Sequence, residues 1–199
     1  MRFVLHLPKD IVIGFSGGKD SIAVAHFLKF RFRRNVTLVH VNNKLPGDDW
    51  IATRAAAFAD NFGFDFGVIE SPAEPTELSC RQARIRAFQG YKQVILAHHL
   101  SDAVESYLRR VCFTGNPGHQ PILFRSKWND TEVLRPFLTT SQKEIQDYLT
   151  RNNLRHWIVK DHLSVGSDRH WMRQNLAPAI ERYGLETVVK KIILKQLRN

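Results

Sequence analysis

Residues 11–21 read IVIGFSGGKDS, an apolar run followed directly by a glycine-rich polar stretch. The run from Ile11 to Phe15 predicts a buried strand, and the residues from Ser21 to Phe30 predict a helix. Adjacent glycines between a strand and a helix let the backbone approach a ligand closely, and the N–H groups at the start of the helix attract anions. The stretch therefore predicts a phosphate-binding loop at the end of a strand.

The chain beyond this loop repeats the alternation of strand and helix. Such regular succession indicates right-handed crossovers and an α/β fold, a parallel sheet with helices on both faces. In sheets of this kind ligands bind at the carboxyl ends of the strands. The further strands are expected over Val36–Val41, Phe64–Ile69 and Val94–Ala97, and the helices over Asp49–Phe62, Thr76–Gln89 and Asp102–Cys112.

The sequence predicts two parts. Residues 1–138 form the catalytic domain that contains the phosphate-binding loop, and residues 139–199 form a helical C-terminal extension packed on it. An edge strand is expected near Glu132–Arg135, and a helix over Ser141–Asn152 opens on a capping box of Ser141 and Glu144.

The last segment, LETVVKKIILKQLRN, has apolar residues at helical spacing, which predicts a helix packed on its own domain. An RNA contact through Lys190, Lys191 and Lys195, or a dimer interface, is the alternative role. The residues predicted on the apolar face are Leu185, Val188, Val189, Ile192 and Leu197.

The composition points to a polyanionic partner. Among 199 residues, 29 are Lys or Arg and 19 are Asp or Glu, so the formal net charge is +10. A surplus of this size favours nucleic acid, with a merely basic protein as the alternative. No apolar run reaches the roughly 18 residues of a membrane span, and no signal peptide is recognisable, so a cytoplasmic chain without a membrane partner is expected. Cys80 and Cys112 form no CxxC pair, which argues against a disulfide framework or a zinc site.

The SGGKDS loop differs from two common nucleotide-binding fingerprints. A Walker loop needs Ser or Thr after its lysine, whereas Asp20 follows Lys19, and no GxGxxG is present. The loop resembles the SGGxDS loop of the N-type ATP pyrophosphatases, the PP-loop family, which cleave ATP between the α and β phosphates. An accidental tight turn is the alternative. The resemblance implies that the ATP phosphates are bound by Ser16, Gly17, Gly18, Lys19, Asp20 and Ser21.

A second stretch, LAHHLSDAVES at residues 96–106, resembles the HHxxDxxET segment of tRNA(Ile)-lysidine synthetases and of the related tRNA 2-thiocytidine synthetases. The spacing of His98, Asp102 and Glu105 allows all three side chains to face the strand ends where ATP would lie. A packed histidine pair, or a metal site made of these three residues, is the alternative reading.

Four further segments extend the resemblance. HVNNKLPGDD at residues 40–49 is similar to the segment that lines the adenosine pocket, which implies that His40 and Asn42 bind the nucleoside. CRQARIR at residues 80–86 resembles the basic helix with a substrate-binding arginine, here Arg81 or Arg84. Leu134-Arg135-Pro136 matches the family's RPL. DRHWMR at residues 168–173, followed by Pro178, resembles DRNxxR…P, with His170 in place of the usual Asn.

The chain also departs from the family pattern. Asn43, Ser101 and Ala103 stand where the family usually has His, Asp and Gln. Glu77 occupies the position that would complete a CxxC with Cys80, which disfavours sulfur transfer.

The resemblance implies an adenylating ligase that uses ATP and Mg²⁺. Asp20 and Asp102 would place the metal, Arg81 or Arg84 would steady the adenylate or the base, and His98 would act as a base towards the amine. The implied partners are tRNA, with its wobble cytidine as the target, and free lysine or another amine, and a homodimer is possible. A non-catalytic RNA-binding protein, or a PP-loop ligase or thiolase acting on another base or small molecule, is the alternative function.

Overall fold

The computed structural model describes residues 1, 6–114, 122–159 and 184–195. Helices and strands alternate along most of this length, as the sequence predicts, and no helix within it has the length and apolar composition that a membrane span requires. The elements are β1 Asp10–Gly14, α1 Lys19–Phe30, β2 Asn35–Asn42, α2 Asp48–Asn61, β3 Asp65–Glu70, α3 Glu77–Ala87, β4 Gln93–Ile95, α4 Leu100–Thr114, β5 Arg125–Trp128, β6 Thr131–Leu134, α5 Gln142–Arg151, the short 3₁₀ helix η1 Arg155–Trp157, and α8 Leu185–Lys195.

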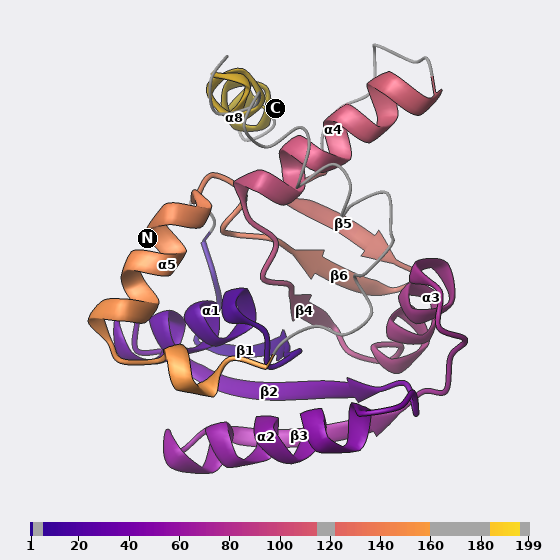
Figure 1. Cartoon of the computed structure of the whole chain (residues 1–199), viewed down its shortest axis with the longest axis vertical. Coiled ribbons are helices and arrows are strands. Elements are labelled where there is room, and N and C mark those ends of the chain that lie inside the picture. Colours follow the sequence, from indigo (N-terminus) through magenta and orange to yellow (C-terminus); the bar gives the residue numbers. More distant parts are fainter. Residues whose placement is uncertain (2–5, 115–121, 160–183, 196–199) are drawn as a thin grey trace.

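A six-stranded sheet in the order β3-β2-β1-β4-β6-β5 forms the centre of the fold (Figure 1). All neighbouring strands are parallel except β5 and β6, which confirms the predicted α/β class. The chain builds outward from β1 to β3 and then returns to place β4 on the other side of β1. The carboxyl ends of β1 and β4 are therefore the switch point of the sheet, where a ligand-binding crevice is expected.

The strand at this edge of the sheet is β5, and not the strand that the sequence predicted there. The strand expected near Glu132–Arg135 is β6, which pairs with β4 on one side and with β5 on the other. A two-residue turn joins β5 to β6, and Asn129 in this turn has a φ of 52°, a conformation that asparagine tolerates better than most residues. The prediction missed β5 because it has only four residues, RSKW, and little apolar content.

Helices cover both faces of the sheet. The main core joins buried residues of β1 and β2 to α1, α2 and α5, with Ile13, Leu38 and Phe58 among its members. A second cluster on the opposite face, under α3, contains Phe88 and Val133. Two separate cores on one sheet are the expected result of crossovers that change direction at β1.

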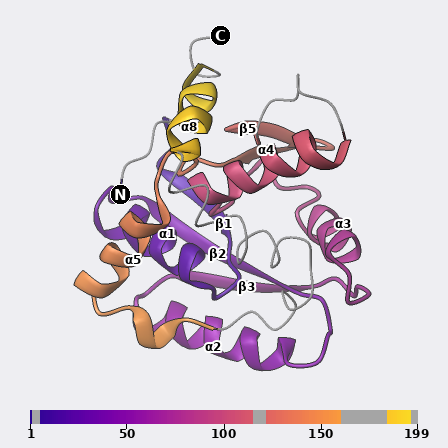
Figure 2. The ribbon, with the colours of Figure 1, turned by 45° about the horizontal axis from the view of Figure 1, so that its top comes forward.

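The segment after residue 138 packs on the main core. The predicted capping box is present, since Ser141 Oγ accepts a hydrogen bond from the Glu144 N–H and the Glu144 carboxylate accepts one from the Ser141 N–H. Ile145 and Leu149 of α5 belong to the same buried cluster as α1, and α5 lies beside α1 in both views (Figures 1 and 2). A division into two units at residue 138 stays a prediction.

The C-terminal helix α8 packs against α4 (Figure 2), with a buried face that differs from the predicted one. Val189 and Ile193 are fully buried, whereas Val188 is 49% exposed, so the prediction for Val188 is wrong and Ile193 was missed. Val189 and Ile193 are four residues apart and therefore lie on the same side of the helix, which faces the core. Val188 points to a different side and is left in solvent. The side chains of Leu185 and Leu197 lie outside the described part of the chain. Exposed lysines on α8 are Lys190, Lys191 and Lys195.

Candidate active site

The loop between β1 and α1 has the shape of an anion-binding loop. Gly17 has a φ of 72°, and Gly18 caps α1 in an extended conformation. Ser21 Oγ donates to the Gly18 carbonyl at 2.9 Å, and the Gly18 N–H donates to Ser16 Oγ at 3.3 Å. Both serine hydroxyls, which lie 3.2 Å apart, are therefore used within the loop. The N–H groups of the first turn of α1 remain the natural donors to a phosphate.

Val159 supports this loop from a distant part of the chain. Its N–H donates to the Gly17 carbonyl at 3.0 Å, and a Cβ added to Gly17 would lie 3.2 Å from Val159 Cγ2. The preceding residues are held against α2, because Arg54 donates to the His156 carbonyl at 2.9 Å and lies 5.4 Å from the centre of the Trp157 ring. No local sequence pattern signals this contact, so Val159 could not be predicted as part of the site.

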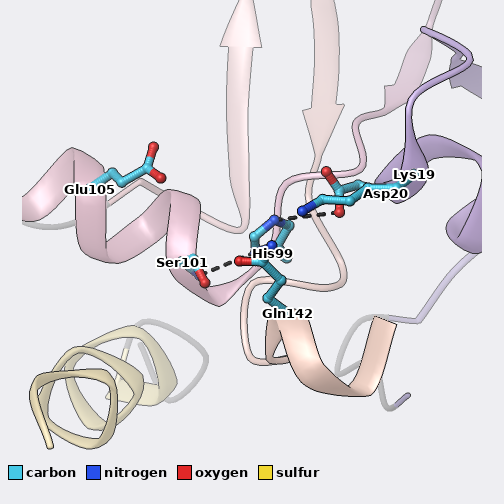
Figure 3. A pocket seen from close by; sticks show the side chains of 6 residues that line it. All are labelled: Lys19, Asp20, His99, Ser101, Glu105 and Gln142. Atoms are coloured by element: carbon cyan, nitrogen blue, oxygen red, sulfur yellow. Dashed lines mark hydrogen bonds and ion pairs between the residues drawn. The ribbon is translucent and has the colours of Figure 1, made fainter. Parts of the chain in front are cut away.

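His99 joins the loop to the start of α4 (Figure 3). Its Nε2 lies 3.5 Å from an Asp20 carboxylate oxygen and 3.6 Å from one of Asp102. Its Nδ1 accepts a hydrogen bond from the Ser101 N–H at 3.2 Å, so the proton of the neutral ring belongs on Nε2, facing both carboxylates. The His99 N–H also donates to Asp102 at 2.9 Å. The structure thus brings Asp20 and Asp102 together around one buried imidazole.

The histidine in this cluster is not the one that the sequence favoured. His99 is 3% exposed and contacts both carboxylates, whereas His98 is half-buried, and its role as a base stays a prediction. The signal for His99 was present in the sequence, because Asp102 is three residues after it and could cap its N–H at the start of a helix.

A pocket opens beside this cluster at the carboxyl ends of β1 and β4 (Figure 3). Glu105 reaches it from α4 and is only 6% exposed, so the predicted neighbour of Asp102 is correctly placed. Ser101 Oγ lies 3.5 Å from a carboxylate oxygen of Glu186 at the start of α8, which the sequence analysis did not foresee. The residues that line the pocket are Lys19, Asp20, His99, Ser101, Glu105 and Gln142.

The two residues predicted for the adenosine pocket, His40 and Asn42, are both buried at the end of β2. His40 Nδ1 donates to the Phe15 carbonyl at 2.9 Å, just before the loop. Burial lowers the pKa of His40 and outweighs this bond and the Asp48 charge, which both raise it. His40 is therefore neutral at pH 7, and its Nε2 is a buried acceptor with no hydrogen bond inside the described ranges.

Asn42 is used mainly for structure. Its side-chain NH₂ donates to Asp49 at 2.7 Å, and its side-chain oxygen accepts from the Lys44 N–H at 2.8 Å. These bonds fold the segment between β2 and α2, so a role of Asn42 in binding the nucleoside stays a prediction.

The predicted substrate arginines lie on α3. Arg81 and Arg84 are both exposed, and neither lines the pocket. Arg135, which directly follows β6, is buried, and burial aided by the positive charge of Arg81 lowers the pKa of Arg135 to about 10. The DRHWMR segment and Pro178 lie outside the described residues.

The site fits the predicted Mg²⁺ in its donor chemistry. Mg²⁺ is usually held by one or two carboxylates together with substrate phosphates and water, and Asp20 and Asp102 offer two carboxylates beside the loop. Residues 1, 6–114, 122–159 and 184–195 contain no group of three His, Cys, Asp or Glu side chains that could hold a metal by themselves. A metal site made of His98, Asp102 and Glu105 is therefore not formed.

A glycine-rich loop after the central strand, facing acidic groups after the next parallel strand, defines a PP-loop domain. The family model described as PP-loop domain matches residues 5–180, so the chain belongs to this family. Its relatives include proteins named tRNA(Ile)-lysidine synthase. The protein of Exiguobacterium sibiricum is 29% identical over 194 residues, which are 90% of this chain and 46% of that protein. The protein of Clostridioides difficile is 26% identical over 205 residues, which are 92% of this chain and 43% of that protein.

The chain spans less than half the length of these curated relatives. Among solved structures, the NH3-dependent NAD synthetase of Campylobacter jejuni aligns with 98% of this chain and 86% of its own, at 15% identity and a TM-score of 0.49.

Proposed function

We propose that this protein is an ATP-dependent tRNA-modifying ligase that joins an amine to a base through an adenylated intermediate. The amine is free lysine and the base is the wobble cytidine of an isoleucine tRNA, as the names of its relatives suggest. The observation that carries the proposal is the position of the SGGKDS loop, with its Asp20, beside His99 and Asp102 at the switch point of the sheet.

The first chemical step uses the loop. The carbonyl oxygen of the base attacks the α-phosphorus of ATP, the bond between this phosphorus and the oxygen bridging to the β-phosphorus breaks, and pyrophosphate leaves. The N–H groups of the first turn of α1 bind the departing pyrophosphate, and Lys19 places a positive charge next to it. Because the Gly17 carbonyl is held by Val159, it is kept away from the anion.

Asp20 and Asp102 are the residues that would hold Mg²⁺ when ATP is bound, and the chemistry such an ion would supply is compensation of the negative charge on the departing pyrophosphate. His99 keeps both carboxylates in position through the contacts of its Nε2, 3.5 Å from Asp20 and 3.6 Å from Asp102. This contact also reduces the repulsion between the two acidic groups, of which Asp102 is buried and Asp20 is partly exposed.

In the second step the amine attacks the base carbon that carries the activated oxygen. The carbon–oxygen bond breaks, AMP leaves, and the nitrogen loses a proton. His98 accepts this proton in our proposal, because it directly precedes His99 in the segment between β4 and α4.

The basic charge of the chain supports RNA as the substrate. A net charge of +10 attracts a phosphate backbone, and Arg81 and Arg84 are exposed on α3, the helix that carries the CRQARIR segment. Moving a base out of a single-stranded anticodon loop and into a pocket costs little free energy, since the base has little stacking to lose.

The test is to incubate the protein with ATP, Mg²⁺, bulk tRNA and labelled lysine. We expect AMP to form and the label to enter RNA. AMP formation that depends on tRNA but not on lysine would point to another amine. RNA binding without any AMP would show a non-catalytic RNA-binding protein and would overturn the proposal.

A further inference from the structure

Arg135 is a buried cation without a carboxylate partner in the described part of the chain. It directly follows β6, so it lies at the carboxyl end of the sheet, and it is only 4% exposed. Its two side-chain hydrogen bonds to described residues both come from Nη1, which donates to the Leu123 carbonyl at 3.1 Å and to Ser126 Oγ at 2.8 Å. Its buried Nε has no hydrogen-bond acceptor among the described residues.

Among the described residues, nothing accepts a hydrogen bond from the Nε side of the Arg135 guanidinium. Burying an ion without a counter-ion is costly, and two neutral acceptors on one nitrogen offset only part of that cost. The unused edge carries the Nε–H and one Nη2–H side by side, and this fork matches two oxygens of a phosphate. An arginine that served only to tie β5 to β6 would need no such unoccupied fork.

Arg81 adds a second positive charge near Arg135. It is exposed on α3, makes no ion pair within the described ranges, and lies close enough for its charge to act on Arg135. The start of α3 is at the carboxyl end of the sheet, because α3 runs from the end of β3 back to the start of β4. Glu77 at this end forms an ion pair with Arg109 of α4 at 3.7 Å.

We propose that Arg135 and Arg81 form a second phosphate-binding site, outside the pocket of Lys19 and His99. The Nε–Nη2 edge of Arg135 binds two phosphate oxygens, and Arg81 supplies charge from the solvent side. The identity of the phosphate rests on the proposed function, which makes it a backbone phosphodiester of the tRNA next to the extruded base. A phosphate of free ATP or pyrophosphate has the same chemistry and is the alternative source.

The experiment measures the affinity of a short single-stranded RNA and of inorganic pyrophosphate for the wild type and for Arg135→Gln and Arg81→Gln. We expect each substitution to weaken RNA binding about 10-fold and to lower the slope of log affinity against log salt by about 0.7, the value for one lost contact to a single strand. Pyrophosphate affinity should stay within twofold of the wild type. The matched control is Arg125→Gln on neighbouring β5, since Arg125 is exposed and already paired with Glu132 at 3.0 Å.

Each outcome decides the proposal. Weakened pyrophosphate binding with unchanged RNA binding would show that the site binds phosphate, but it would overturn the assignment of that phosphate to RNA. Unchanged affinity for both ligands in both variants would overturn the site. If Arg135→Gln fails to fold, Arg135→Lys and the exposed Arg81→Gln carry the test, and Arg135→Lys should lose affinity because lysine keeps the charge but lacks the fork. Wild-type AMP formation is measured separately, so a failure of the proposed ligase activity is distinguishable from a failure of this site.

Discussion

The site has two halves that are built in different ways. The phosphate loop at residues 16–18 is shaped by backbone conformation and neutral hydrogen bonds, including the one from Val159 to Gly17. The neighbouring cluster of Asp20, His99 and Asp102 is held by charges and by a buried imidazole. The loop should therefore fail when its backbone is strained, and the cluster should fail when a charge is removed without any change in shape.

The largest effect is expected from removing a charge in the cluster. Asp20→Asn keeps the size of the side chain but removes a carboxylate that faces His99 and the pocket. We expect AMP formation to fall about 1,000-fold, the order seen when one electrostatic group of a preorganised site is lost, with little change in thermal stability. Asp65→Asn, at the exposed start of β3, is the control and should keep full activity. Unchanged AMP release by a folded Asp20→Asn protein would remove Asp20 from the site.

A backbone change tests the loop. Gly17→Ala forces a side chain into a φ of 72° and brings its Cβ to 3.2 Å from Val159, so we expect AMP formation to fall about 100-fold as the loop shifts. Gly90→Ala is a matched control, because Gly90 has a φ of 91° and a Cβ there would meet nothing within 4 Å. Both variants should lose about 1 kcal/mol of unfolding free energy to backbone strain, measured by urea unfolding. Equal activities in the two variants would show that loop shape is irrelevant to the reaction.

His99→Gln sharpens the contrast between the halves. Glutamine can still donate a hydrogen bond, but it cannot reproduce the ring that contacts Asp20, Asp102 and the Ser101 N–H together. We expect a loss of about 1–2 kcal/mol in unfolding free energy and about a 10-fold lower rate of AMP formation. His98→Gln at the half-buried neighbour should cost less stability. A larger loss of stability from His98→Gln than from His99→Gln would mean that the wrong histidine has been placed between the carboxylates.

The smallest effect concerns pH. Burial lowers the pKa of His40, which is bonded to Phe15 next to the loop, so its folded-state pKa lies below the unfolded value of about 6.5. The unfolded chain therefore takes up this proton first, and stability is lost as pH falls through about 6.5. His40→Asn should flatten this part of the curve, measured by urea unfolding between pH 7.5 and 5.5. Parallel curves for the variant and the wild type would show that His40 does not contribute.

Most of the fold was predictable from local sequence patterns. Strand and helix periodicity predicted the four strands up to Val94 and the helices between them to within a few residues, because buried strands and amphipathic helices carry their signal locally. The short strand β5 has four mostly polar residues and was invisible to the same reasoning. The buried face of α8 was only half predicted, since the position of α4 decides whether Val188 or Ile193 faces the core.

The site residues that lie within a single sequence motif were predictable. The SGGKDS loop and the HHLSD segment each predicted residues that the structure brings together, namely Asp20 and Asp102. The support of Gly17 by Val159 and the approach of Glu186 to Ser101 join segments far apart in the chain. Contacts of this kind depend on the final packing and leave no periodic or local signal.

The most direct test is the fate of ATP labelled at its α-phosphorus, incubated with the wild-type protein, Mg²⁺, tRNA and lysine, beside the Asp20→Asn variant. The account predicts labelled AMP together with an equal amount of free pyrophosphate from the wild type, and neither product above background from the variant. Labelled ADP in place of AMP, or AMP released equally by both proteins, would contradict it.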